Sequence, residues 1–182
     1  MIQSFLDFDG KHVGELIAIC ALGLTVYQAY LARSHNKLSV RPHLTQFTHR
    51  DKRPSQGVLV YRILNNGVGP AFIKSFEIFL DGQLVTDPDQ ALATVLPARQ
   101  YNHSVTRLGN DYSMAAGEAK DILILALPLG EGDTLKQIEE KLNRFDLVIE
   151  YESAYKEPGR LDTRTEKQSV NKALKPTQKR SI

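Results

Sequence analysis

The apolar run LIAICALGLTVYQAYLA occupies residues 16–32 of the 182-residue chain and decides its class. A helix over this run is apolar on every face, whereas an amphipathic helix shows a polar stripe. A membrane-spanning helix needs about 20 mostly apolar residues, because the hydrocarbon layer is about 30 Å thick. Val13 and Gly14 extend the run toward that length, so the sequence predicts a transmembrane helix over residues 13–33. Its large apolar side chains are the predicted membrane anchors: Leu16, Ile17, Ile19, Leu22, Leu24, Val26 and Leu31.

The charges on either side of the run predict its orientation. They are Asp7, Asp9, Lys11 and Glu15 before the run, and Arg33, Lys37 and Arg41 after it. Because cytoplasmic flanks carry the excess of Lys and Arg, we expect a short extracytoplasmic N-terminus over residues 1–12 and a cytoplasmic domain after the helix. The expected location is the inner (plasma) membrane, crossed once.

Three other interpretations of the run compete with a membrane span. The core helix of a soluble protein is an alternative that needs only a shorter run. A cleaved signal peptide has a basic leader and a small-x-small cleavage site, whereas the leader MIQSFLDFDG is acidic. A lipoprotein signal has a small residue before its cysteine, but Ile19 precedes Cys20.

A pilin-like secretion component is a further alternative. Type IV pilins have a glycine cleavage site, a glutamate five residues later and then an apolar helix, and Gly10 and Glu15 have this spacing. However, the charged Lys11 follows the glycine, where pilins have an apolar residue. A pilin helix would also continue past Pro42, which ends this one.

Charge and cysteine content exclude several classes. The formal net charge of +2 gives no strong field for nucleic acid. Cys20 is the only cysteine, so one chain has neither a disulfide framework nor a cysteine zinc site. About 130 residues remain between the anchor and the tail, enough for one hydrophobic core. The sequence therefore predicts a β domain over residues 38–170 and a basic, disordered tail over residues 171–182.

After residue 36 the apolar pattern changes from helical to extended. Alternating or β-branched runs predict strands, and the first is an edge strand because it contains Pro42. The expected strands cover residues 38–44, 58–64, 72–80, 120–127 and 145–155, with a weak one at 163–170. Thr134 and Gln137 have capping-box spacing and predict a helix over residues 134–143. Residues 91–95 fit either a helical turn or a short strand.

The order of these elements predicts the fold class. Short sequential strands with turns such as Asp81-Gly82, and without βαβ alternation, favour a mainly β fold: an immunoglobulin-like antiparallel β-sandwich with one short helix. The two cysteines of immunoglobulin domains are absent, so the likeness concerns architecture only. Residues two apart in a strand face the same side, which predicts two core faces: Phe72, Phe76, Ile78 and Leu80, and Phe145, Leu147, Ile149 and Tyr151.

The segment NNGVGPA at residues 65–71 predicts a tight connection between two strands. Gly67 and Gly69 permit positive φ, and Pro70 fixes φ. Asn65 can satisfy local backbone groups. These four residues are the candidate structural turn.

The same segment carries a resemblance to a known family. A strand, the pattern N-x-G-x-G-P-A and a strand that ends in Asp-Gly resemble the β-sandwich domain of uncharacterised bacterial single-pass membrane proteins. In those proteins an N-terminal helix is followed by a short R-P-x-L strand, matched here by Arg41, Pro42 and Leu44. The resemblance covers residues 13–155 and implies a fold and a topology, without an activity.

The sequence carries no recognisable catalytic or cofactor motif. GVGPAF lacks the third glycine of a dinucleotide loop, and the chain has no G-x-S-x-G, H-E-x-x-H or paired C-x-x-C pattern. His43 and His49 lie six residues apart, too far to share a metal on one strand. We therefore expect no catalytic residue, cofactor or metal. An enzyme with an unrecognised site near His103 and Asp111 is the remaining enzymatic alternative.

The loop over residues 101–112 has the composition of a recognition surface, with aromatic anchors among adaptable polar groups. Its candidate partner-binding residues are Tyr101, His103, Arg107, Asp111 and Tyr112. The basic cluster at residues 49–53 could touch anionic headgroups. These features predict a membrane-tethered, non-enzymatic protein-interaction or assembly module, an accessory subunit of a larger complex. Its expected partners are membrane lipid and another, membrane-associated protein, with no nucleic acid.

Overall fold

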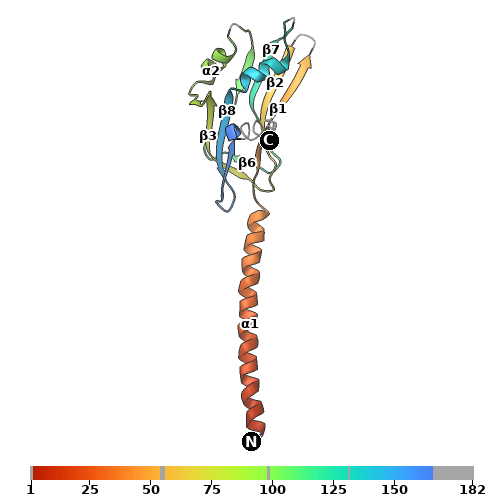
Figure 1. Cartoon of the computed structure of the whole chain (residues 1–182), viewed down its shortest axis with the longest axis vertical. Helices are drawn as coiled ribbons and strands as arrows, with labels where there is room; N and C mark the ends of the chain where they lie inside the picture. The colour runs from red at the N-terminus through yellow and green to blue at the C-terminus, as the bar shows by residue number, and fades with distance from the viewer. Residues whose placement is uncertain (1, 54–55, 98, 131, 166–182) are drawn as a thin grey trace, which may run out of the picture. The chain divides into compact units, whose positions relative to one another are not determined.

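The computed structural model describes residues 2–53, 56–97, 99–130 and 132–165 (Figure 1). The chain divides into two units, Met1–Ser39 and Val40–Ile182. The first unit contains one helix, and the second contains the strands and two short helices. The predicted tail over residues 171–182 lies outside the described residues.

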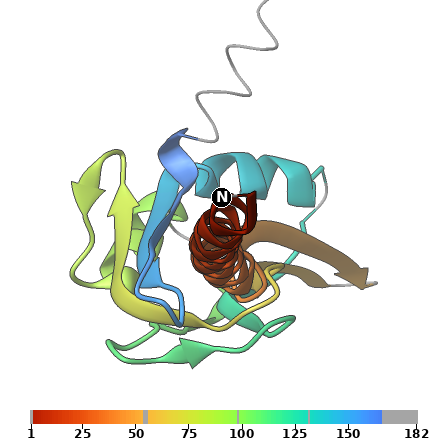
Figure 2. The same cartoon turned by 90° about the horizontal axis from the view of Figure 1, so that it is seen from below.

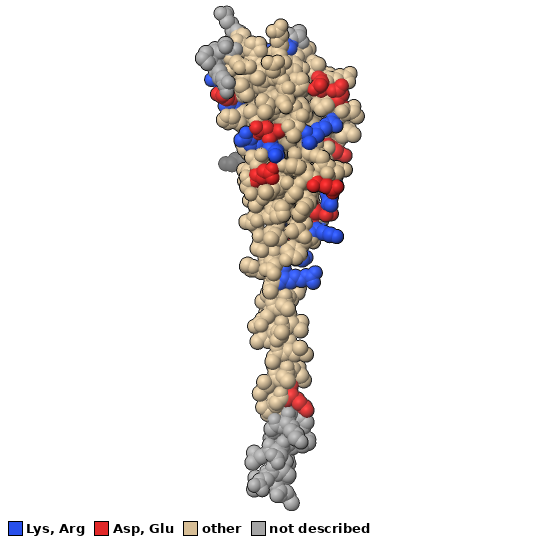
Figure 3. Space-filling model, turned by 180° about the vertical axis from the view of Figure 1, so that it is seen from behind, with Lys and Arg blue, Asp and Glu red and all other residues tan. Residues whose placement is uncertain are grey.

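Helix α1 (Ile2–Leu38) confirms that the apolar run is helical, and it extends beyond residues 13–33 at both ends. Its stretch Val13–Leu38 is the one helix among the described residues that is long and apolar enough to cross a membrane. Between Glu15 and Arg33 this stretch carries no charged side chain, as the tan surface of Figure 3 shows. The helix ends before Pro42, because proline lacks an N–H and disfavours helical backbone at the residue before it.

The second unit is built from two antiparallel sheets (Figures 1 and 2). The first sheet has the order β1-β2-β7-β5, and the second has the order β4-β3-β8-β9 with β6 paired to β3. The first comprises β1 (Leu44–Arg53), β2 (Gln56–Asn65), β7 (Ala119–Pro128) and β5 (Asn102–Val105). The second comprises β4 (Gln83–Leu84), β3 (Ala71–Leu80), β8 (Phe145–Glu152), β9 (Pro158–Asp162) and β6 (Ser113–Met114). β1 and β5 are therefore the edge strands of the first sheet.

Helix α2 (Pro88–Val95) shows that the helical alternative for residues 91–95 is correct and that the helix begins earlier. The Asp87 side chain caps it by accepting hydrogen bonds from the backbone N–H groups of Asp89 at 2.9 Å and Gln90 at 3.3 Å. An aspartate N-cap followed by proline is a helix-start signal in the sequence. The described fold thus has a second short helix that the sequence left ambiguous.

Helix α3 (Leu135–Leu142) has the expected capping box. The Gln137 N–H donates to Thr134 Oγ1 at 3.3 Å, and the Thr134 N–H donates to Gln137 Oε1 at 3.2 Å. Its apolar stripe is buried, so the helix packs on the core through that face.

Side chains from both sheets meet in the core, which consists of two clusters. The first cluster joins the two sheets and includes Ile63, Ile73, Ile122, Ile149 and Leu161. The second joins the first sheet to both short helices and includes Leu59, Leu92, Leu125, Ile138 and Leu142. Burying one such side chain contributes roughly 1.5–3 kcal/mol, so apolar burial between these layers is the main stabilising contribution to the second unit.

One extra residue in β3 changes which side chains face the core. The pairing of β3 with β8 shifts between Ile73 and Ser75, so Lys74 is the residue of a β-bulge. Ile73 is 0% exposed, whereas Phe72 is 37% exposed. The expectation that Phe72 shares the core face of residues 76–80 is therefore wrong. β3 ends in the expected Asp81-Gly82 turn, with φ angles of 51° and 82°.

Two other strands begin and end at different residues from those expected. Residues 38–44 do not form an edge strand, and β1 begins at Leu44. The preceding backbone bonds instead to the β2–β3 connection: the Val68 N–H donates to Arg41 O at 3.1 Å, and the Asn66 N–H donates to His43 O at 2.7 Å. β9 precedes the expected strand at 163–170, of which residues 166–170 lie outside the described residues. The predicted core face of β8 is confirmed, since its members are buried or pack against the core.

The glycines of the β2–β3 connection are required by close approach and not by positive φ. Gly82, Gly117 and Gly132 are the described glycines with positive φ. A Cβ on Gly69 would lie 1.9 Å from the Val40 carbonyl oxygen. A Cβ on Gly67 would lie 2.4 Å from the backbone nitrogen of residue 43. The chain over residues 40–43 therefore fits against this connection only if both positions are glycine.

Gly69→Ala tests this close approach. We expect it to lower the free energy of unfolding by roughly 3 kcal/mol, because the new methyl group would displace backbone atoms of Val40. Gly109→Ala is the matched control, since a Cβ there meets nothing within 4 Å and no loss of stability is expected. Urea unfolding of the full-length variants, followed by circular dichroism, measures the difference. Equal stability of the two variants would show that the connection does not require glycine at position 69.

Candidate functional site

The side chain of Asn65 joins several segments of the second unit at one point. Asn65 is 0% exposed, and its Nδ2 donates to the Gly69 carbonyl oxygen at 2.8 Å and to a carbonyl oxygen of β6 at 3.1 Å. Its Oδ1 accepts hydrogen bonds from the N–H groups of His43 at 3.1 Å and Gly67 at 3.0 Å. Pro70 leads from this point into β3. The amide has its donors and its acceptor satisfied, so its bonds shape the domain and leave nothing for a ligand.

The predicted partner loop, residues 101–112, has parts in both sheets. Its first part contains β5, which pairs with β7 in the first sheet. Its last part contacts β3 in the second sheet, where the Tyr112 carbonyl oxygen accepts a hydrogen bond from the Ile73 N–H at 2.9 Å. The loop crosses from one sheet to the other, and its candidate residues are divided between these places.

His103 lies in β5 and bonds to α2. Its Nε2 lies 2.7 Å from Asp89 Oδ1, and its ring meets that of Tyr101 edge-on, with the ring centroids 5.4 Å apart. The carboxylate bonded to His103 is thus that of Asp89 of α2, a residue that the sequence analysis did not name beside it. The Asp89 side chain is 76% exposed, so the pair links a surface strand to a surface helix.

Arg107 and Asp111 have structural contacts. The Arg107 guanidinium donates to the carbonyl oxygens of Val85 at 3.2 Å and Thr86 at 3.0 Å, which holds the β4–α2 connection. Asp111 has a φ of 69°, and its N–H donates to Ile73 O at 3.1 Å. Both residues fix the path of the chain.

Tyr112 belongs to a polar cluster next to β7. Its hydroxyl donates to Glu118 Oε1 at 2.5 Å, and the Ala115 N–H donates to Glu118 Oε2 at 2.8 Å. The Lys120 Nζ lies 3.2 Å from the same carboxylate and 5.4 Å from the centroid of the Tyr112 ring. The Tyr112 hydrogen bond, followed by that from Ala115, lowers the pKa of Glu118.

A groove lies beside Tyr101 at the end of the first sheet. This Tyr101 groove is lined by Gln56, Ala93, Leu96, Arg99, Gln100, Tyr101, Asn102, Ala126 and Pro128. It combines an aromatic ring with amides, an arginine and small apolar side chains, a composition that suits contact with a polypeptide. In the sequence, only the contiguous polar residues around Tyr101 indicated a contact surface here. No sequence signal indicated that residues of β2, α2 and β7 would also line the groove.

Arg99 fixes one wall of the Tyr101 groove. Its Nη1 and Nη2 donate to the two carboxylate oxygens of Asp133 at 3.0 and 2.7 Å. This paired geometry raises the pKa of Arg99 and lowers the pKa of Asp133. Both groups stay charged near neutral pH, so the wall keeps its shape there.

The basic cluster at residues 49–53 forms the second half of β1. Arg50 Nε bonds to Glu139 of α3, which places this guanidinium in an ion pair within the protein. Among the described residues, no group of three or more His, Cys, Asp and Glu side chains is arranged to hold a metal ion.

Comparison with known proteins adds no family to this geometry. No protein-family model matches the sequence, and no curated protein matches it. The resemblance to bacterial single-pass membrane proteins therefore stays a prediction that depends on the residue pattern around Asn65.

Tyr112→Phe tests the contribution of the Tyr112 hydroxyl. Glu118 has an ordinary pKa of about 4.3 in the unfolded chain. Because its folded pKa is lower, its contribution is present above about pH 4.3 and is lost as the pH falls through the folded value. At pH 7 we expect Tyr112→Phe to lower the free energy of unfolding by about 0.5–1 kcal/mol, a small effect because the carboxylate is partly in solvent. The deficit should shrink as the pH is lowered below about 4.

Tyr155→Phe, at a tyrosine that is 44% exposed, is the matched control. Urea unfolding at a series of pH values measures both variants against the unchanged protein. A deficit for Tyr112→Phe that stays constant with pH would contradict the role given to Glu118.

Proposed function

We propose that the chain is a single-pass membrane protein in which α1 anchors an immunoglobulin-like domain that binds another protein. In this proposal the domain is a non-enzymatic accessory subunit of a larger assembly. The observation that carries the proposal is the exposure of the 26-residue stretch Val13–Leu38, which is apolar and unburied. In this proposal a membrane supplies the apolar surroundings of the helix.

The magnitude of this exposure supports a membrane location. The anchor side chains are between 47% exposed at Leu31 and 67% exposed at Ile19. Each contributes roughly 1.5–3 kcal/mol when it is fully buried in an apolar environment. The summed transfer free energy of these side chains from water to hydrocarbon is much larger than the entropy cost of immobilising one helix. The excess of basic residues after the span supports an orientation in which the helix crosses the inner membrane and the domain lies in the cytoplasm.

The strand order supports the immunoglobulin-like class. In that class one sheet has the order A-B-E-D and the other pairs C with F and G, with C′ added beyond C in some members. When the strands are lettered in chain order, the first sheet, β1-β2-β7-β5, has the order A-B-E-D. The second sheet, β4-β3-β8-β9, then has the order C′-C-F-G. β6 is an additional short strand. Ile63 of β2 and Ile149 of β8, both 0% exposed, occupy the core where immunoglobulin domains carry a disulfide.

The Tyr101 groove is the proposed contact surface for the partner protein. It offers a half-buried tyrosine next to an arginine whose position is fixed by Asp133. Tyrosine and arginine are enriched among the residues that dominate binding energy at interfaces, and tyrosine supplies a large contact area at little cost in conformational freedom. β5 is also an edge strand, so the groove lies beside a strand that has one neighbour in its sheet.

Charged substitutions within α1 test the membrane anchor. Ile19→Arg combined with Leu22→Arg places two charges in the middle of the span, each at a cost of about 2.5–3.5 kcal/mol. We expect the unchanged chain to stay in the membrane pellet after alkaline carbonate extraction and the double variant to be released. Leu84→Arg, at an exposed leucine of β4, is the control and should stay in the pellet.

Protease protection in spheroplasts decides the orientation. If the domain is cytoplasmic, protease added to intact spheroplasts leaves it whole, and protease added after lysis removes it. Release of the unchanged chain by carbonate would refute the anchor, and digestion in intact spheroplasts would refute only the orientation.

Photocrosslinking tests the contact surface. We expect p-benzoylphenylalanine in place of Tyr101 to give one discrete crosslinked species in cells, detected as a shift on a denaturing gel. The same residue in place of Tyr155 is the control and should give none. Identical crosslinking patterns from the two positions would remove the Tyr101 groove as the specific surface.

A further inference from the structure

The second unit begins at Val40, and the tips of three loops lie at the same end of it. The β2–β3 connection is held there because the Val68 N–H donates to Arg41 O at 3.1 Å. The β6–β7 turn is held there because the Gly117 N–H donates to Asn65 O at 2.9 Å. The β8–β9 turn lies at this end because the last residue of β8 pairs with the second residue of β3. We define the Val68 end as these three loop tips, residues 66–68, 115–117 and 154–156.

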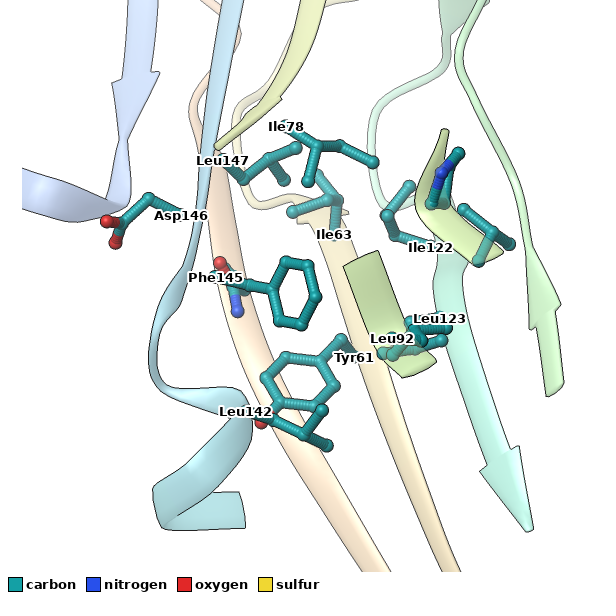
Figure 4. Close-up of a pocket in the computed structure, with 13 residues that line it drawn as sticks. Tyr61, Ile63, Ile78, Leu92, Ile122, Leu123, Leu142, Phe145, Asp146 and Leu147 are labelled. Carbon is teal, nitrogen blue, oxygen red and sulfur yellow. The ribbon is translucent and has the colours of Figure 1, made fainter. Parts of the chain in front are cut away.

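Apolar side chains are exposed at the Val68 end. Val68 is 66% exposed and Tyr155 is 44% exposed. Small exposed residues complete the other positions of the tips: Ala115, Ala116 and Ala154. The apolar side chains of the core, such as Ile63 and Leu147, lie together between the strands of the two sheets (Figure 4). Packing within the core therefore does not account for the apolar residues at the tips.

The charged side chains of the tips and of the segment that enters the second unit are basic. Arg41 and Lys156 are both exposed. The acidic residues beside the tips are paired or half-buried: Glu118 with Lys120 at 3.2 Å, Glu152 with Lys74 at 3.3 Å, and the half-buried Glu157. The Val68 end thus combines apolar tips with exposed positive charge.

Lys156 has a backbone conformation that favours glycine. Its φ is 59°, in the left-handed region, which is unfavourable for a residue with a Cβ. Such strain persists where other interactions compensate it, and it is frequent at functional sites. A contact made by the lysine ammonium group would offset this cost.

Chain length keeps the Val68 end close to the bilayer that α1 is proposed to span. Helix α1 ends at Leu38, and the second unit begins at Val40. A helix rises 1.5 Å per residue and an extended chain at most about 3.6 Å, so Val40 lies within about 16 Å of Ala32, the last residue of the apolar run. The headgroup layer on each side of the hydrocarbon is itself about 5–8 Å thick. The loop tips are therefore within reach of lipid headgroups.

We propose that the Val68 end rests on the surface of an anionic bilayer, with Val68 and Tyr155 among the headgroups and Lys156 beside lipid phosphates. Tyrosine favours this depth because its ring is apolar and its hydroxyl is polar. A basic side chain next to an anionic leaflet is attracted to it. The proposal rests on the anchoring of the chain by α1 and goes beyond it, because an anchor alone does not hold the domain against lipid.

This contact leaves the Tyr101 groove open to a partner. The groove is lined by Gln56 at the start of β2 and by Pro128 at the end of β7, at the opposite end of the first sheet from Asn65. With the Val68 end on the bilayer, the groove faces away from the membrane.

Fluorescence quenching of the full-length chain in lipid nanodiscs, one copy per disc, tests the contact. Cys20→Ala removes the one cysteine of the chain, and Val68→Cys, Leu84→Cys or Leu24→Cys then carries a single environment-sensitive fluorophore. The nanodiscs contain anionic phosphatidylglycerol and a lipid with a nitroxide quencher on its headgroup or on its acyl chain. Leu84, which is 57% exposed and lies in β4 at the far end of β3, is the matched control.

We expect the label at position 68 to lose most of its fluorescence to the headgroup nitroxide and the label at position 84 to stay bright. The acyl-chain nitroxide should quench the label at position 24, which reports the anchor independently. Lys156→Gly suits the left-handed backbone and should leave the fold intact. This variant should lower the ratio of docked to undocked domains about fivefold, because it removes one charge near the anionic surface. Fluorescence recovered at position 68 measures this change.

The three labels separate failure of the contact from failure of the anchor. Equal brightness at positions 68 and 84, with position 24 quenched, would overturn the contact and leave the anchor intact. An unquenched label at position 24 would refute the anchor, and the contact with it. A blue-shifted but unquenched label at position 68 would indicate a protein neighbour in place of lipid and would also overturn the contact.

Discussion

The buried amide of Asn65 is the interaction on which the rest of the second unit depends. An amide removed from water is unfavourable unless its donors and acceptor are paired, and here the partners come from separate segments. Their positions hold residues 40–43 against the β2–β3 connection and bring Leu44 opposite Asn65, which sets the register of β1 on β2. The same connection delivers the chain from the first sheet to the second. The Asn65 side chain thus fixes both the register of β1 on β2 and the path of the chain from the first sheet to the second.

The elements that the sequence predicted are those with a local cause. The α1 run, the β2 and β7 runs and the Thr134 capping box each carry their signal within a few residues, and the structure has them. The missed features depend on residues far apart in the chain. The bulge at Lys74 arises from pairing with β8, and His103 takes Asp89 because α2 packs beside β5. The segment after Asn65 was predicted as a turn, but its glycines are required because the backbone of Val40 lies against them. No local sequence pattern indicates this contact.

The second core cluster and the Tyr101 groove share one structural element, helix α2. Helix α2 places Leu92 in that cluster, and Ala93 and the C-cap residue Leu96 line the groove. The Asp89 carboxylate in its first turn bonds to His103 of β5, so the helix is held at its start as well as by its apolar face. One short helix therefore contributes both to the core and to the surface groove. The sequence could not show this, because the residues that share the second core cluster with α2 come from distant strands and from α3.

The length of β1 has a consequence for contact between copies of the protein. An edge strand of ten residues presents unpaired N–H and C=O groups, and a long uncharged edge attracts the same strand of a neighbouring copy. The second half of β1, residues 49–53, has the sequence HRDKR. Two such edges brought together would place basic side chains near one another. Arg50 is also held by α3, which brings a helix to the side of the strand. The charges that look like a ligand-binding cluster thus oppose edge-to-edge pairing of β1 with the same strand of a second copy.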